Sequence, residues 1–126
     1  MRQHVPLTEA VLVGVAGASA VAVGAFGAHA LRGVLGDAAL GTWHTGVEYH
    51  FWHALALALA VAVPAAGRAR RVAVWAFVAG IVLFSGSLYA LALGAPRIVG
   101  AITPFGGVAF IVGWIGLAIA VRARAT

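Results

Sequence analysis

Three of the five histidines and one of the three acidic residues fall in a single stretch of the chain, residues 41–53. The side chains of this stretch that could do chemistry are His44, Glu48, Tyr49, His50 and His53. In a helix that turns about 100° per residue, Tyr49, His50 and His53 share one face. His44 and Glu48 lie one turn apart on roughly the opposite side. One straight helix therefore cannot bind a single metal ion with all of these side chains.

A metal site in this region needs a further ligand from another helix. The weak candidates are His29, His50 and His53, because neutral imidazoles suit zinc, copper or iron. Two histidines three residues apart are weak evidence by themselves, so hydrogen-bonded structural histidines and proton transfer are the alternatives. The sequence does not show whether any metal or other cofactor is bound, and it assigns no catalytic residue.

The composition of the chain suits a bilayer better than water. Of the 126 residues, 63% are hydrophobic and only 9% are charged, and the mean hydropathy is +1.06. Such a chain has too little polar surface to cover a soluble globule. It contains no cysteine, which excludes disulfides, thiolate metal ligands and cysteine nucleophiles.

Four apolar segments predict four membrane helices, at approximately 8–30, 43–63, 72–93 and 99–121. The uncharged run 10–28 alone spans about 28 Å at roughly 1.5 Å per residue, which is close to the hydrocarbon thickness. Because the connections are short, the expected fold is an all-α, integral membrane antiparallel four-helix bundle. Residues 1–126 are expected to form a single membrane domain.

The segments before and after residue 30 are interpreted from their polarity and length. The polar, glycine-rich residues 31–46 are interpreted as a loop. The first apolar segment has a second interpretation as a cleaved signal peptide, since Arg2 precedes it and Ala28-His29-Ala30 fits a cleavage site. Its length favours a retained helix, because the apolar region of a signal peptide has only about 7 to 15 residues.

The arginines predict the orientation of the helices. Six are expected on one side of the membrane: Arg2, Arg68, Arg70, Arg71, Arg122 and Arg124. Only Arg32 and Arg97 belong to the other two connections. The positive-inside rule then places both termini in the cytoplasm, as expected for a multi-pass protein of the cell inner membrane. Because topology explains the net charge of +5, no nucleic-acid partner is expected.

In this orientation all four helices place polar residues in the outer half of the membrane. Polar groups in hydrocarbon must face one another or a wet cavity, so they predict a pocket that binds a ligand. The predicted pocket residues are His29, Arg32, His44, Glu48, Tyr49, His53, Ser85, Ser87 and Tyr89. Glu48 is expected roughly 7 Å inside the second helix. It either pairs with an arginine or histidine there or faces headgroups and water.

Several short motifs, distributed over all four segments, are similar to those of a known family. They are Gly24-Ala25-Phe26-Gly27-Ala28-His29-Ala30-Leu31, residues 43–49, His53-Ala54-Leu55-Ala56-Leu57, Phe84-Ser85-Gly86-Ser87-Leu88-Tyr89, Thr103-Pro104-Phe105-Gly106-Gly107 and Gly113-Trp114. The chain thus resembles the small bacterial inner-membrane proteins called domain of unknown function 423, which are related to eukaryotic transmembrane protein 256. The resemblance implies an uncleaved four-helix protein, often with glutamine in place of His50, and it implies no activity.

Three functions remain open from the sequence. The favoured one is a small membrane protein whose outer-leaflet pocket binds a small ligand, a lipid headgroup or a partner subunit, as a single chain or a homo-oligomer. The second is a proton-coupled transporter of small solutes that acts as a homo-oligomer. The third is a metal- or haem-binding membrane protein. No nucleophile elbow, phosphate-binding loop or pair of carboxylates is present, so enzyme activity is less favoured.

Overall fold

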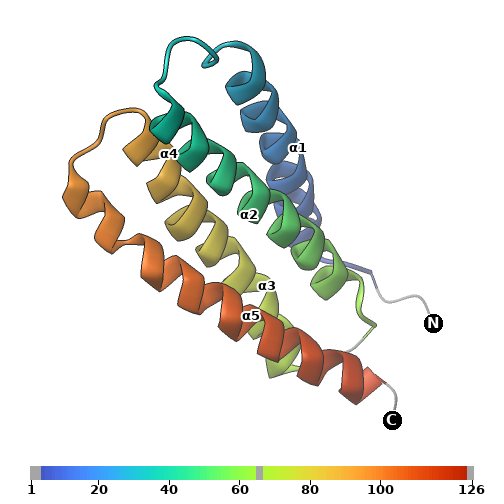
Figure 1. Cartoon of the computed structure of the whole chain (residues 1–126). Helices are drawn as coiled ribbons and strands as arrows, with labels where there is room; N and C mark the ends of the chain where they lie inside the picture. Colours follow the sequence, from blue (N-terminus) through green and yellow to red (C-terminus); the bar gives the residue numbers. More distant parts are fainter. Residues whose placement is uncertain (1–3, 65–66, 125–126) are drawn as a thin grey trace.

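The computed structural model describes residues 4–64 and 67–124, and the regular structure that it contains there is helical (Figure 1). The α-helices are α1 (Leu7–His29), α2 (Asp37–Ala62), α3 (Arg68–Gly80), α4 (Gly86–Ala92) and α5 (Thr103–Arg124). A π-helical turn, η1 (Ile81–Ser85), joins α3 to α4 in one continuous rod, and a 3₁₀ turn, η2 (Arg97–Ala101), precedes α5. The predicted all-α four-helix membrane bundle is confirmed.

α2 begins earlier than predicted. It starts at Asp37, whereas the sequence indicated a start near residue 43, and the prediction of a loop is therefore wrong beyond Gly36. Gly36 precedes the helix in an extended conformation, and the carboxylate of Asp37 lies in the first turn, where the helix dipole favours negative charge. Trp43 is only 4% exposed, and its indole N–H donates to the carbonyl oxygen of Val23 on α1 over 2.9 Å. These contacts hold the first turns of α2 against α1.

The last helix begins later than predicted. It was expected from residue 99, but Arg97–Ala101 forms the 3₁₀ turn η2, and the α-helix begins at Thr103. Pro104 occupies the first turn of α5, where its missing N–H has no intrahelical partner to lose. Arg2, which contributes to the predicted orientation, lies outside the described residues.

Three helical segments are long and apolar enough to cross a membrane: Leu7–His29, Arg68–Ala92 and Arg97–Ala123. α2 is not among them, because it contains Glu48 and three histidines. It is the best enclosed helix, however, since it runs between α1 and the α3–α4 rod (Figure 1). Neighbouring helices therefore cover much of the polar surface that would otherwise face hydrocarbon.

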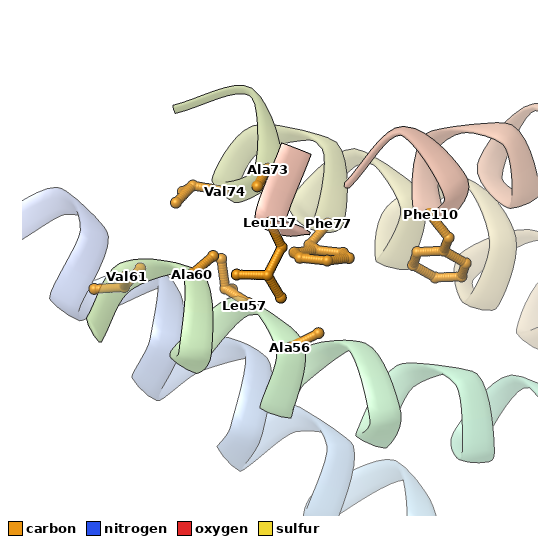
Figure 2. Close-up of a cluster of buried hydrophobic side chains, with 9 residues drawn as sticks. All are labelled: Ala56, Leu57, Ala60, Val61, Ala73, Val74, Phe77, Phe110 and Leu117. Carbon is orange, nitrogen blue, oxygen red and sulfur yellow. The ribbon is translucent and has the colours of Figure 1, made fainter. Parts of the chain in front are cut away.

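The half of the bundle near the start of α3 contains a cluster of nine buried hydrophobic residues (Figure 2). Phe77 and Leu57 are fully buried at its centre, and Phe110 is only 3% exposed. α5 packs closely on the α3–α4 rod because glycines face aromatic rings. A Cβ at Gly113 would lie 2.6 Å from the ring of Phe77, and a Cβ at Gly80 would collide with Phe110. These glycines allow the backbones to approach, as small residues do in membrane proteins.

Candidate functional site

His50 is at the centre of a hydrogen-bonded network that joins three helices. Its Nε2 lies 3.1 Å from the carbonyl oxygen of Ala16 and 3.1 Å from Oγ of Ser19, both on α1. Its Nδ1 lies 2.9 Å from the hydroxyl oxygen of Tyr89 on α4. A carbonyl oxygen can only accept, so we assign the proton to Nε2, and Nδ1 accepts from the Tyr89 hydroxyl. With this assignment the imidazole is neutral, and both of its nitrogens have hydrogen-bond partners.

His53 is held as the other neutral tautomer. Its Nδ1–H donates to the carbonyl oxygen of Tyr49 over 2.7 Å, and its Nε2 accepts from the indole N–H of Trp114 over 3.1 Å. The residue is 5% exposed, and its ring stacks on Phe110 with 3.5 Å between the ring centroids. His53 therefore connects α2 to α5 through one hydrogen bond and one stacked ring.

The serines of the predicted pocket also bond within the protein. Ser85 donates to the carbonyl oxygen of Gly46 over 2.7 Å. Oγ of Ser87 lies 2.6 Å from Oγ1 of Thr103 and bonds the carbonyl oxygen of Phe84 over 2.9 Å. Among the described residues, every buried side-chain nitrogen or oxygen has a hydrogen-bond partner. These polar groups hold the helices together and leave no buried polar atom unsatisfied for a ligand to complete.

The structure divides the predicted pocket residues into two groups. Five are buried or half-buried inside the bundle: Tyr49, His53, Ser85, Ser87 and Tyr89. Four are exposed: His29, Arg32, His44 and Glu48. No hydrogen bond or ion pair between described residues joins one group to the other. On α2 the reason is geometric, because Glu48 and His44 face away from the side that carries His53.

Glu48 lies deeper in the helix than the sequence indicated. It follows Asp37 by eleven residues, or roughly 16 Å at about 1.5 Å per residue. The expected depth of about 7 Å assumed a helix that began near Trp43. No described residue forms an ion pair or hydrogen bond with its carboxylate.

The three metal candidates are not brought together. His29 is exposed at the end of α1, and both ring nitrogens of His50 and of His53 already form hydrogen bonds. Within residues 4–64 and 67–124, no three His, Cys, Asp or Glu side chains are close enough to hold a metal ion. A ligand role for His50 or His53 would require one of these hydrogen bonds to break.

A groove of about 850 Å³ opens on the side of the bundle between α2 and α5. Six aromatic rings line it: Tyr49, Trp52 and His53 of α2, Phe84 of η1, and Phe110 and Trp114 of α5. Trp52 is 52% exposed and Val108, on the opposite wall, is 59% exposed. The groove therefore opens laterally, which in a membrane protein means toward the hydrocarbon.

An ion pair that the sequence analysis misses lies near the start of α1. Both carboxylate oxygens of Glu9 accept hydrogen bonds from Arg70 of α3, over 3.1 and 2.6 Å. Arg70 also donates to the carbonyl oxygen of Val61 over 2.9 Å, close to the end of α2. Three helices are thus joined at this point. One signal was available, since Glu9 is an isolated acid at the end of the bundle where the arginines gather.

Comparison with known proteins identifies the family. The sequence profile described as "Protein of unknown function (DUF423)" matches residues 23–107, which include His50, Tyr89 and most of the groove residues. The chain belongs to the DUF423 family. The resemblance seen in the sequence motifs is therefore confirmed.

Curated relatives of this DUF423 protein are named as membrane proteins. The UPF0382 membrane protein YwdK of Bacillus subtilis is 52% identical over 105 residues, covering 80% of this chain and 85% of the relative. The UPF0382 inner membrane protein YgdD of Escherichia coli is 48% identical over 101 residues, covering 75% and 73%. A Haemophilus influenzae relative is 44% identical over 108 residues, covering 85% and 87%. No solved structure matches the chain. The relatives' names give a location in the membrane and no activity.

Proposed function

We propose that this protein is a binding component of the inner membrane, which holds an apolar, membrane-embedded molecule in the groove between α2 and α5. The groove itself is the observation that carries the proposal. Its volume of about 850 Å³ is within the range of ligand sites, and its aromatic walls offer large rigid contact surfaces. Its lateral opening suits a molecule that arrives from the bilayer.

The hydrogen bonding inside the bundle supports a role in binding a ligand more than a role in catalysis. His53, at the groove, has both ring nitrogens engaged, one by the backbone carbonyl oxygen of Tyr49 and the other by the indole N–H of Trp114. A ligand in the groove would therefore meet mainly ring faces and aliphatic carbon. Binding there would depend on shape and on dispersion contacts.

Transport is supported less well. Between the His50 network and the Glu9–Arg70 pair, the described part of the interior is the hydrophobic cluster around Leu57 and Phe77 (Figure 2). A polar path for a proton or solute would be interrupted there.

Two earlier expectations form part of this proposal. We place both termini in the cytoplasm, because Arg68, Arg70, Arg71 and Arg122 lie at the same end of the bundle as the start of α1. His29 and Arg32 then lie at the outer end, where their exposed side chains are proposed to contact lipid headgroups. His44 is proposed to contribute to the same polar outer surface.

Photo-crosslinking in native membranes tests the groove. Benzoylphenylalanine at Trp52 or Val108 is expected to give an adduct of one defined mass. The same residue at Val21, which is 58% exposed on α1, should give none of that adduct. Gly107→Leu should abolish the adduct, because Gly107 lines the groove and the nearest atom to a Cβ there is 4.0 Å away in the Phe84 side chain. Identical products at all three positions would overturn the proposal.

A further inference from the structure

We infer that the occupant of the groove is a transmembrane helix of another protein, and that this helix places a basic side chain against Glu48. The inference rests on the proposed groove function and names the class of partner. Two observations carry it, namely the depth of Glu48 in the bundle and the absence of any partner for it among the described residues.

Contacts between α1 and α2 give the depth of Glu48. Just before it, Val47 lies beside Gly24, where an added Cβ would be 3.4 Å from the valine side chain. Just after it, His50 bonds the carbonyl oxygen of Ala16. Glu48 is thus level with the segment of α1 between Ala16 and Gly24. That segment is the middle of a helix that runs from Leu7 to His29 and is long enough to span the bilayer.

At this depth an exposed carboxylate needs a partner. Glu48 faces outward, and it forms no ion pair or hydrogen bond with any described residue. Lysine and arginine can extend toward the interface on long flexible stems, but a glutamate side chain is too short for this from the middle of a span. Ionisable groups within membranes almost always pair or face a wet cavity. The inferred partner therefore comes from outside the described part of the chain.

Neither a lipid nor a second copy supplies that partner readily. Lipid headgroups lie about 15 Å from the bilayer midplane, since the hydrocarbon core is about 30 Å thick. The chain contains no lysine, and its eight arginines precede, follow or terminate the apolar segments. A second copy in the same orientation would place those arginines near the ends of the bundle, not beside Glu48.

The groove lies next to Glu48 on the same helix. Trp52 lines the groove and follows Glu48 by four residues, so the two side chains are neighbours on one face of α2. A helix seated along the groove would pass Glu48 as well. A lysine or arginine near the centre of that helix would meet the carboxylate in a low-dielectric setting, where such a pair is strong.

Model peptides test this chemistry directly. Three acceptor-labelled peptides are built from alternating leucine and alanine, and each is long enough to span the bilayer. One has a lysine at the centre, the second has a lysine near one end, and the third, the leucine peptide, has no lysine. Each is reconstituted in phosphatidylcholine vesicles with the labelled protein, and association is followed by energy transfer. The centre-lysine peptide should bind about tenfold more tightly than the leucine peptide, because interhelical polar pairs in membranes reach this size. Glu48→Gln should remove that preference, and Thr45→Ala, one turn away, should preserve it.

The outcomes separate the two proposals. If no peptide binds and Gly107→Leu does not change the photo-crosslinked adduct, the groove function fails. If the leucine peptide binds in the groove but lysine adds nothing, the groove function stands and the Glu48 inference is overturned. A lysine preference that survives Glu48→Gln, or stronger transfer between two copies of this chain that depends on Glu48, also overturns the inference.

Discussion

Trp114 donates its indole N–H to Nε2 of His53 over 3.1 Å, and this bond joins α5 to α2 at the base of the groove. The two helices otherwise meet little, since α5 packs mainly on α3 and η1. The same bond fixes the tautomer of His53, because Nδ1–H is already donated to Tyr49. One hydrogen bond therefore fixes both the position of α5 against α2 at the groove and the tautomer of the buried His53 imidazole.

Trp114→Phe should lower the free energy of unfolding by about 1 kcal/mol, because Nε2 of His53 loses its donor inside the bundle. Equilibrium unfolding of the detergent-solubilised protein by a denaturing detergent measures the change. Trp75→Phe is the matched control, since Trp75 is 49% exposed. Equal effects of the two substitutions would show that the bond to His53 adds nothing.

His50→Gln should change stability by less than about 1 kcal/mol, whereas His50→Leu should cost about 2 kcal/mol. The glutamine amide can donate to Ala16 and accept from Tyr89, which are the two roles of the imidazole. Leucine leaves the Tyr89 hydroxyl without its acceptor. The same unfolding experiment compares the two variants. Similar losses for glutamine and leucine would contradict the assigned network.

Gly106→Ala should destabilise the bundle by about 3 kcal/mol, near the upper end of overpacking effects. A Cβ at this position would collide with the backbone nitrogen of Phe84 and lie 2.7 Å from its Cα, and neither atom can rotate away. Gly14→Ala is the control, because nothing lies within 4 Å of a Cβ there, and alanine should be neutral or slightly stabilising. Thermal aggregation of the purified variants ranks the two. A tolerated Gly106→Ala would contradict the close packing of α5 on η1.

Glu9→Ala should cost about 3 kcal/mol, because it leaves Arg70 largely buried without its carboxylate. The double variant Glu9→Leu with Arg70→Leu should recover most of that loss, since an apolar pair removes both charges. Arg71→Ala, at an exposed position, serves as the control. If the double variant is no more stable than Glu9→Ala, the loss does not come from an unpaired buried arginine.

The helices follow from the sequence because apolar runs of membrane length leave the backbone few alternatives. The two faces that helical periodicity predicted for this stretch are also correct, since His50 and His53 are buried while His44 and Glu48 are exposed. Periodicity alone establishes such faces. It does not locate helix ends, and α2 begins at Asp37 because of contacts with α1 that no local pattern reveals.

The polar residues were harder to predict because their types do not give their partners. His50 and Ser19 are 31 residues apart, and His53 and Trp114 are 61 residues apart. Only the packed bundle brings them together. Counting polar residues in one leaflet grouped Glu48 with His53, although about 140° of helix rotation separates them. The groove was not predicted, since it arises from how far α5 stands from α2.

The depth of position 48 in the bilayer decides whether the carboxylate of Glu48 needs a partner. The chain has no cysteine, so Glu48→Cys can be spin-labelled at a single site and reconstituted in vesicles. Val82, 64% exposed within η1, and Val34, 74% exposed between α1 and α2, provide the references. Collision rates with oxygen, which enters hydrocarbon, and with a water-soluble nickel complex report the depth. We predict high oxygen and low nickel accessibility at position 48, as at position 82. Accessibility at position 48 like that at position 34 would place Glu48 in water and contradict the need for a partner helix.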